Sequence, residues 1–243
     1  MVKTVIFDID NTLYNFDTAH EAGMEAVCNY VYEQFGWEKE AFTAVYRDVM
    51  KELFDELGDI GSAHNRLLRF ERILEDRGLP LSPHAMKLYS LYWDTLIEES
   101  EISPGAEETM RELKKRGIRV GIGSDMTAWV QYRKLEKLGL LQYCDFVVTS
   151  EESNADKPDT RFYSMCLKKA QCEPFECIYV GDNYWKDYRG SMGAGIKPLW
   201  FVPPHLEKKA EAIGDESARR IGELFEILMV TVQNPLYKHS FTQ

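Results

Sequence analysis

Two aspartates follow a short apolar run close to the amino terminus. The run extends from Val5 to Phe7, and Asp8 and Asp10 come where it ends. Residues of this kind favour a buried strand. Open α/β sheets bind their ligands at the carboxyl ends of strands. Two acids in that position therefore indicate a metal site or acid–base chemistry.

Five short segments rich in β-branched and aromatic residues predict buried strands. They are residues 4–7, 119–123, 146–149, 178–181 and 199–202. Helical patterns separate the last four of these strands. A further helix, bounded by Ser103 and Gly117, comes just before the second strand. Alternating strands and helices predict an α/β fold, a doubly wound, Rossmann-like parallel sheet with helices on both faces.

The long segment between the first two strands carries helical patterns and no strand pattern. In residues 16–100, apolar residues recur at helical spacing, with breaks rich in glycine and proline. We therefore expect residues 16–100 to form a second, all-helical cap domain, a bundle of four helices. Residues 1–15 and 101–243 would form the core domain, with a loose tail after Pro235.

Charge and composition narrow the class of partner. The chain of 243 residues has a formal net charge of -11, which argues against binding the phosphate backbone of nucleic acid. It has no apolar run near the length of about 20 residues that a membrane helix needs. The five cysteines are odd in number and lack metal-ligand spacing, so we expect a cytoplasmic protein. The oligomeric state stays open, because an apolar patch cannot be told from core in a sequence.

Three further polar clusters lie where predicted strands end. They are Ser124 with Asp125, Lys157, and Asp182 with Asn183 and Asp187. Each cluster alone is typical of a turn or a solvated loop. However, all of them fall at the carboxyl ends of parallel strands, which meet at one edge of the sheet. We therefore expect them to converge with Asp8 and Asp10 on a single site.

This order of motifs resembles the haloacid dehalogenase (HAD-like) superfamily. The motifs are Asp8-Ile9-Asp10-Asn11-Thr12, Ser124, Lys157, and Gly181-Asp182 with Asp187. The resemblance covers the whole chain and includes a helical cap inserted after the first strand. It implies the phosphatase branch of the superfamily. Such an enzyme would be a Mg²⁺-dependent hydrolase of a small-molecule phosphomonoester, with a nucleotide or a sugar phosphate as substrate.

Two carboxylates side by side can divide the work of phosphate hydrolysis. A carboxylate can attack phosphorus and hold the phosphoryl group, so Asp8 is the expected nucleophile of an aspartyl-phosphate mechanism. The leaving alkoxide must gain a proton, and the attacking water must later lose one. Asp10 is the expected acid and then base, in agreement with the resemblance.

The negative charge of such a site requires counter-charge. A phosphate dianion beside Asp8 and Asp182 would be repelled unless cations and hydrogen-bond donors were present. We expect the phosphate to be bound by Ser124, Asp125 and Lys157. Mg²⁺ suits a site of carboxylate and carbonyl oxygens.

The resemblance also assigns the metal ligands. It implies that Asp8, the backbone carbonyl of Asp10, and Asp182 hold Mg²⁺. Asp187 and Asn183 are expected to orient these ligands rather than to bind the metal directly.

Three other functions fit the same motifs to different degrees. Dehalogenases of this superfamily lack the second acid, so Asp10 argues against dehalogenation. A sugar phosphomutase would need cap groups for a second phosphate, which His64, Arg66 and Arg69 could supply. On a helix with apolar neighbours we expect these side chains on the solvent face instead. An inactive phosphate-binding regulatory protein is the third alternative.

Overall fold

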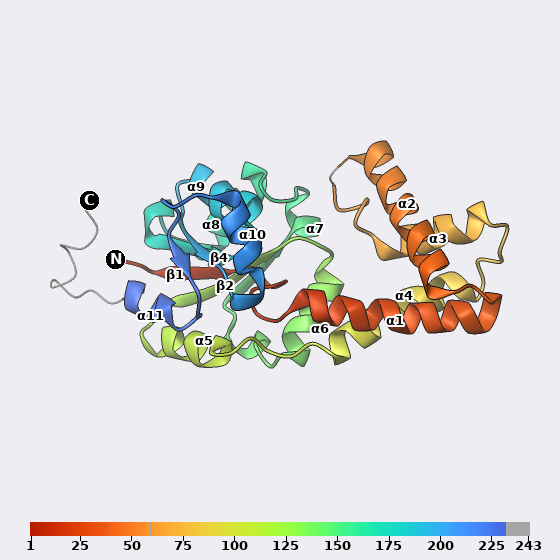
Figure 1. Cartoon of the computed structure of the whole chain (residues 1–243). Helices are drawn as coiled ribbons and strands as arrows, with labels where there is room; N and C mark the ends of the chain where they lie inside the picture. Colours follow the sequence, from red (N-terminus) through yellow and green to blue (C-terminus); the bar gives the residue numbers. More distant parts are fainter. Residues whose placement is uncertain (59, 232–243) are drawn as a thin grey trace.

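The computed structural model describes residues 1–58 and 60–231, so the tail expected after Pro235 lies outside the described residues. Six parallel strands form one sheet in the order β3-β2-β1-β4-β5-β6 (Figure 1). The strands are β1 (Thr4–Phe7), β2 (Arg119–Ser124), β3 (Phe146–Thr149), β4 (Cys177–Gly181), β5 (Lys197–Phe201) and β6 (Arg220–Ile221). The predicted doubly wound parallel sheet is confirmed.

Helices cover both faces of this sheet. They are α5 (Ala106–Lys115), α6 (Ala128–Lys137), α7 (Ser150–Ser153), α8 (Thr160–Ala170), α9 (Gly190–Gly193), α10 (Glu207–Ile213) and α11 (Glu226–Thr231). Successive side chains of a strand point to opposite faces. Val5 and Phe7 of β1 accordingly pack in one apolar cluster with α5 and α6, and Ile6 packs in another with α8. Burial on both sides explains why the strands are continuously apolar.

Among the elements that were not predicted from the sequence, two are especially short. Strand β6 has two residues, and helix α7 has four. Neither is long enough to repeat a period of two or of 3.6 residues, which is the signal that reveals an element.

Four cap helices lie between β1 and α5, and they extend to one side of the sheet (Figure 1). We use the name cap helices for α1 (Phe16–Phe35), α2 (Lys39–Leu57), α3 (Arg66–Asp76) and α4 (His84–Glu98). Helix α1 packs along α4, and α3 packs on both α2 and α4. Fully buried aromatic side chains, among them Phe42, Phe70 and Tyr92, fill the space between these helices.

The two chain connections between the sheet and the cap helices lie side by side. Tyr14 forms an antiparallel bridge with Ile102, and Ser103 N donates to Leu13 O at 2.8 Å. Asn15 caps helix α1 by accepting a hydrogen bond from Thr18 N. These contacts place the start of α1 next to the aspartates that follow β1.

Cap helix α4 also packs against α6, one of the helices that cover the sheet. Arg133 Nη2 lies 2.8 Å from Asp94 Oδ1, and Lys137 Nζ lies 2.9 Å from Glu98 Oε1. None of the helices in residues 1–58 and 60–231 combines the length and the apolar character that a membrane span requires.

Candidate active site

The strand order brings the sequence motifs to one edge of the sheet. The chain runs outward from β1 to β3 and then returns to β4 on the other side of β1, so the topology reverses at β1 and β4. Such a reversal leaves a crevice at the carboxyl ends of the two strands. Asp8 follows β1 and Asp182 follows β4, and Asp8 N donates to Val180 O at 2.8 Å. The two acids therefore flank the crevice.

Lys157 joins two buried carboxylates in this crevice. Its Nζ lies 2.8 Å from Asp8 Oδ1 and 2.6 Å from Asp187 Oδ1. The exposed fractions of the three side chains are 3%, 7% and 0%. Burial lowers the pKa of Lys157, but the charges of Asp187 and Asp8 outweigh it and raise the pKa well above its usual value. Lys157 is therefore a fixed positive charge next to Asp8.

Asp8, Asp182 and Asp187 form an all-oxygen group that could hold a metal ion. One carboxylate oxygen from each lies within 4.8 Å of the others. Burial, opposed by Lys157 and supported by Asp187, raises the pKa of Asp8 to about 7. Burial, with Asp187 and Asp8, also raises the pKa of Asp182 well above its usual value. Burial is the main cause of both shifts, and the charges of the neighbouring carboxylates add to it.

Asp187 belongs to this group together with Asp8 and Asp182, the two carboxylates expected to bind the metal. Its two oxygens already accept hydrogen bonds, Oδ1 from Lys157 and Oδ2 from Asn183 N at 2.9 Å. The Asn183 side chain caps the π-helix Tyr184–Arg189. Asp187 and Asn183 are thus placed to orient Lys157 and the loop after β4.

Ser124 is the last residue of β2 and Asp125 follows it, on the other side of Asp8. Neighbouring side chains hold both residues in place. Gln131 Nε2 donates to Ser124 Oγ at 2.9 Å. The Asp125 carboxylate accepts from Lys157 N at 2.9 Å and from Lys186 Nζ at 3.0 Å. A negative carboxylate with these partners cannot itself attract a phosphate, so Asp125 would contribute through its backbone while Lys186 adds positive charge nearby.

The sequence did not reveal the partners of Asp10. Lys134 Nζ lies 2.6 Å from Asp10 Oδ1, and the Tyr14 hydroxyl donates to the same oxygen. The Lys134 side chain is fully buried, with Nζ 5.5, 5.7 and 5.4 Å from the ring centres of Tyr14, Phe16 and Trp93. Aromatic faces stabilise a buried ammonium. The sequence signal that could have predicted this burial is the position of Lys134 among the regularly spaced apolar residues of α6.

These partners control the charge of Asp10. Burial alone would raise its pKa, but the charge and hydrogen bond of Lys134, together with the Tyr14 hydroxyl, lower the pKa below its usual value. Asp10 is therefore held as a carboxylate in this structure.

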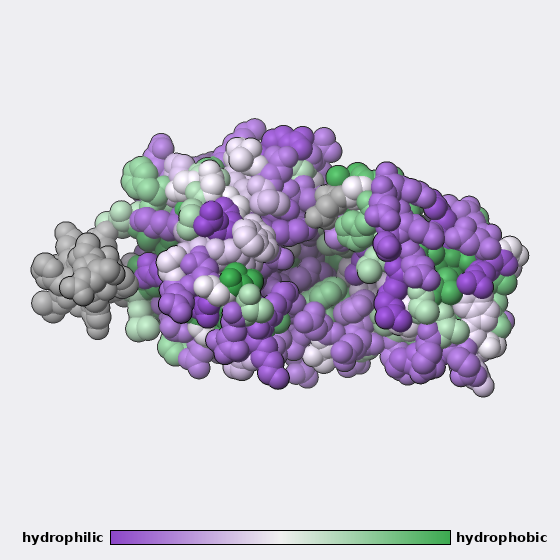
Figure 2. Space-filling model, turned by 45° about the horizontal axis from the view of Figure 1, so that its top comes forward, coloured by the Kyte–Doolittle hydropathy of each residue, from purple (hydrophilic) through white to green (hydrophobic). Residues whose placement is uncertain are grey.

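Two adjoining cavities lie between the cap helices and the sheet edge. The larger has a volume of about 620 Å³ and includes Lys157 in its lining, and the smaller, of about 230 Å³, includes Asp10. Arg66, Trp93 and Asp156 line both. Figure 2 shows this hollow between the two lobes, with hydrophilic residues along much of it. Spaces of this size suit a small metabolite.

The expectation that Arg66 and Arg69 lie on the solvent face of their helix is wrong. Only 9% of Arg66 and 3% of Arg69 is exposed. Arg66 stacks against the rings of Tyr92 and Trp93, and Arg69 against that of Tyr46. Long cationic side chains can be buried in this way when aromatic faces receive them.

Comparisons with known proteins agree with the fold. A family model described as haloacid dehalogenase-like hydrolase matches residues 2–195. The ribulose-1,5-bisphosphate 5-phosphatase of Halopiger xanaduensis is 31% identical over 238 residues, which cover 94% of this chain and 100% of that protein. The pyrimidine 5'-nucleotidase of Streptococcus pneumoniae is 26% identical over 214 residues, 86% of this chain and 88% of that protein.

The fold is also shared with solved structures. A crystal structure of a HAD phosphatase from Thermococcus onnurineus has a TM-score of 0.69 and 23% identity, and the match covers 94% of this chain and 97% of that one. The family model spans most of the chain, and a relative above 30% identity spans nearly all of it. On this evidence the chain belongs to the haloacid dehalogenase-like hydrolase family.

Proposed function

We propose that the chain is a Mg²⁺-dependent phosphatase that hydrolyses a small-molecule phosphomonoester through an aspartyl phosphate on Asp8. The observation that carries the proposal is the buried carboxylate of Asp8, which contacts the ammonium of Lys157 and forms one group with the acids Asp182 and Asp187. The relatives are named as phosphatases of a sugar phosphate and of pyrimidine nucleotides. We expect the substrate of this chain in one of these two classes.

In the first step, Asp8 attacks phosphorus and the ester oxygen leaves. Lys157 holds Asp8 Oδ1 at 2.8 Å, which orients the carboxylate and supplies positive charge for the phosphoryl oxygens. We expect Ser124 and the backbone of Asp125 to donate hydrogen bonds to the same oxygens. In the second step, water attacks the phosphorus of the aspartyl phosphate and regenerates Asp8.

The acidic group fits Mg²⁺, because its donors are all oxygen and carry more negative charge than the nearby lysine offsets. Asp8, the backbone carbonyl of Asp10, and Asp182 would hold the ion, with Asp187 orienting Lys157 beside it. When bound, Mg²⁺ supplies charge that lets a phosphate dianion approach the carboxylates and stabilises the transition state.

Asp10 manages the proton in both steps. Its ionised form, which Lys134 stabilises, is the form that accepts a proton from the attacking water. For the first step the proton would pass from the ammonium of Lys134, 2.6 Å away, through Asp10 to the leaving oxygen. In the second step the proton that Asp10 takes from water would return to the neutral amine of Lys134, which restores the starting state. The pKa of that ammonium is lowered by burial in spite of Asp10, which makes it a better donor than an ordinary lysine.

Lys134→Met should move the acidic limb of the pH–rate profile to higher pH, by about one unit or more. Without Lys134, burial raises the pKa of Asp10. When the solution is acidified, Asp10 then takes up a proton at a higher pH than in the wild type. The protonated form can no longer accept a proton from water. The measurement is kcat against pH with an aryl phosphate. Lys137→Met, on the same helix but in an exposed pair with Glu98, is the control that should leave the limb in place. An unchanged limb in Lys134→Met would contradict this role.

The cap helices suit a cover that opens and closes over the crevice. We propose that residues 16–100 form the cap domain on a core of residues 1–15 and 101–243. The paired connections at Tyr14 and Ile102 would serve as its hinge. Closure would shut water out of the first step, and opening would release the product.

A panel of sugar phosphates and nucleotides, assayed with Mg²⁺ and again with excess chelator, tests this function. We expect inorganic phosphate to be released with Mg²⁺ and to fall to background with chelator. Tight phosphate binding without turnover would instead favour a phosphate-binding protein. Isomerised sugar phosphate in place of free phosphate would favour a mutase.

A further inference from the structure

Within residues 1–58 and 60–231, three buried polar atoms have no hydrogen-bond partner and belong to residues that line both cavities. They are Arg66 Nε, Trp93 Nε1 and Asp156 Oδ1. Buried polar groups in folded proteins nearly always have partners, and an unmade hydrogen bond in the interior is costly. Two donors from the cap helices and one acceptor from the core thus surround the same space. A ligand with matching groups would complete all three.

Arg66 carries a buried positive charge at this space. It begins helix α3, and its Nη1 donates to His64 O at 2.9 Å. Within residues 1–58 and 60–231, no carboxylate forms an ion pair with it. The guanidinium is instead sandwiched near aromatic rings, 5.2 Å from the centre of Tyr92 and 5.9 Å from that of Trp93. A buried guanidinium without an anion is unfavourable, because ion pairing or hydrogen bonding must replace its hydration.

Arg69, one turn further along α3, shows what a structural arginine looks like in the same helix. Its Nε and Nη2 donate to Ala63 O at 3.2 and 2.8 Å, and its Nη1 donates to Tyr46 OH at 3.2 Å. It lines neither cavity. The two arginines are similarly buried, so the missing partners of Arg66 reflect its position at the cavities.

We propose that Arg66 and Trp93 form a subsite for a second anionic group of the substrate, separate from the phosphate that is hydrolysed, and that Asp156 accepts a hydrogen bond from a hydroxyl of the same molecule. The proposal rests on the proposed phosphatase function and narrows its substrate class. The substrate is then a small hydroxylated phosphomonoester with a carboxylate or a second phosphate.

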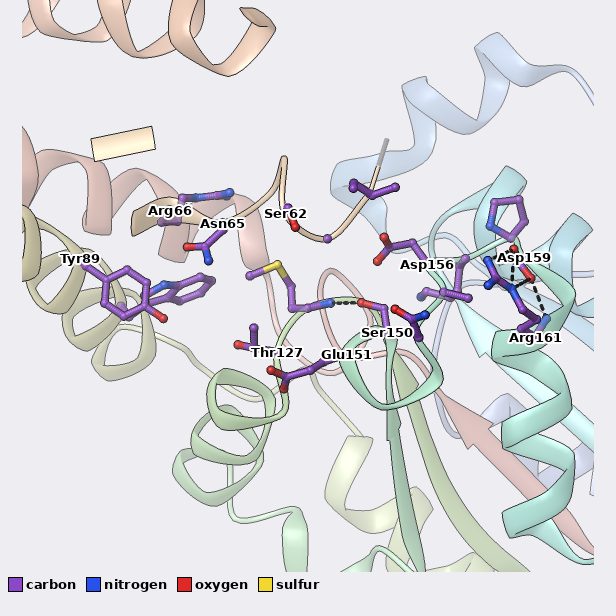
Figure 3. Close-up of a pocket in the computed structure, with 18 residues that line it drawn as sticks. Ser62, Asn65, Arg66, Tyr89, Thr127, Ser150, Glu151, Asp156, Asp159 and Arg161 are labelled. Carbon is purple, nitrogen blue, oxygen red and sulfur yellow. Dashed lines mark hydrogen bonds and ion pairs between the residues drawn. The ribbon is translucent and has the colours of Figure 1, made fainter. Parts of the chain in front are cut away.

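The geometry of the cavities supports this class over a neutral leaving group. Figure 3 shows Arg66 on the cap side of the larger cavity, with Asp156 across the space on the core side. The smaller cavity connects the same residues to Asp10, whose role is at the leaving oxygen. An anion bound at Arg66 therefore belongs to the leaving group. Arginine binds both carboxylate and phosphate through paired N–H groups, so both remain candidates for that anion.

Two pairs of substrates test the proposal on the full-length protein. Each pair shares a phosphomonoester and differs in a second acid: 3-phosphoglycerate with glycerol 3-phosphate, and fructose 1,6-bisphosphate with fructose 6-phosphate. The wild type should prefer the diacid of at least one pair, which also identifies the second acid as carboxylate or phosphate. Arg66→Gln should lower kcat/KM for that diacid by about 10- to 100-fold, mainly through KM, and change the monoacid less than about 3-fold. Arg66→Lys should lower kcat/KM for that diacid by a smaller factor.

Arg69→Gln is the matched control, because it removes a buried guanidinium that does not line the cavities. It should lower thermal stability and leave the ratio of diacid to monoacid kcat/KM unchanged. A wild type without preference for either diacid would overturn the proposal. So would an Arg66→Gln variant that loses diacid and monoacid activity equally, since that pattern indicates a role in folding or in cap closure against Asp156.

A binding measurement distinguishes failure of this proposal from failure of the proposed function. Calorimetry with both substrate pairs, on Asp8→Asn with and without Arg66→Gln, measures the subsite without turnover. If the wild type hydrolyses no phosphomonoester, the phosphatase proposal fails. Diacid binding that is at least 10-fold tighter than monoacid binding, and that depends on Arg66, would still support the anion subsite. Equal binding of diacid and monoacid would reject it.

Discussion

Asp8→Asn should reduce turnover by a factor on the order of 10⁴ or more, because an amide cannot form the acyl phosphate on which both steps depend. The loss should appear in kcat for aryl and alkyl phosphates alike. Substrate binding should persist, since Lys157 keeps its contact with Asp187. The measurement is phosphate release at saturating substrate and Mg²⁺, with binding followed separately.

The same substitution should not destabilise the protein at neutral or alkaline pH without metal. Burial raises the pKa of Asp8 to about 7, so the folded state holds a proton on Asp8 that the unfolded state has already released. The stability linked to this group is present at low pH and is lost as the pH rises through 7. Asparagine carries no charge at any pH. The melting temperature of Asp8→Asn should therefore equal or exceed that of the wild type at pH values above 7.

Asp94→Asn is the control for this comparison, because Asp94 is a surface carboxylate, 59% exposed, paired with Arg133. It should change neither turnover nor the pH dependence of the melting temperature. Turnover of Asp8→Asn within about 10-fold of the wild type would contradict the assignment of Asp8 as nucleophile.

Lys157→Met should both destabilise the protein and abolish most of its activity. It leaves Asp8 and Asp187 buried without their shared cation, and removal of one partner from a buried ion pair costs roughly 3–5 kcal/mol. For a chain of this size we expect a fall of about 10 °C in melting temperature. Activity should fall by at least about 100-fold, because a phosphate dianion would meet uncompensated carboxylates. Thermal melts and phosphate release measure the two effects.

Lys3→Met provides the matched comparison for Lys157→Met. Lys3 lies 2.8 Å from Glu176, the distance that separates Lys157 from Asp8, but its side chain is 58% exposed. Exposed pairs contribute about 1 kcal/mol or less, so Lys3→Met should change the melting temperature little. Similar melting temperatures for the two variants would show that burial does not strengthen the Lys157 contacts.

The parallel sheet and most of the site could be predicted from the sequence for one physical reason. Strands covered on both faces are continuously apolar, and the residues at their carboxyl ends are polar where the ligand crevice lies. Asp8, Lys157 and Asp182 accordingly stand out as polar residues directly after apolar runs or in the loops that follow them. Strand β6, with two residues, has no such run.

The partners of these residues could not be predicted, because they depend on packing between distant segments. Lys134 lies 124 positions after Asp10, and on a helix its spacing indicates only which face it shares. Arg66 looked like a solvated residue because amphipathic periodicity assigns cations to the wet face. Its burial depends on the rings of Tyr92 and Trp93, which another cap helix supplies.

Rapid acid quench within a single turnover tests the aspartyl-phosphate mechanism most directly. Wild-type protein is mixed with Mg²⁺ and excess substrate, quenched, digested and analysed by mass spectrometry. We predict a phosphoryl group on Asp8 that forms before free phosphate accumulates and is absent from Asp8→Asn. Release of phosphate at the full rate by an enzyme that never carries a phosphoryl group on Asp8 would contradict the mechanism.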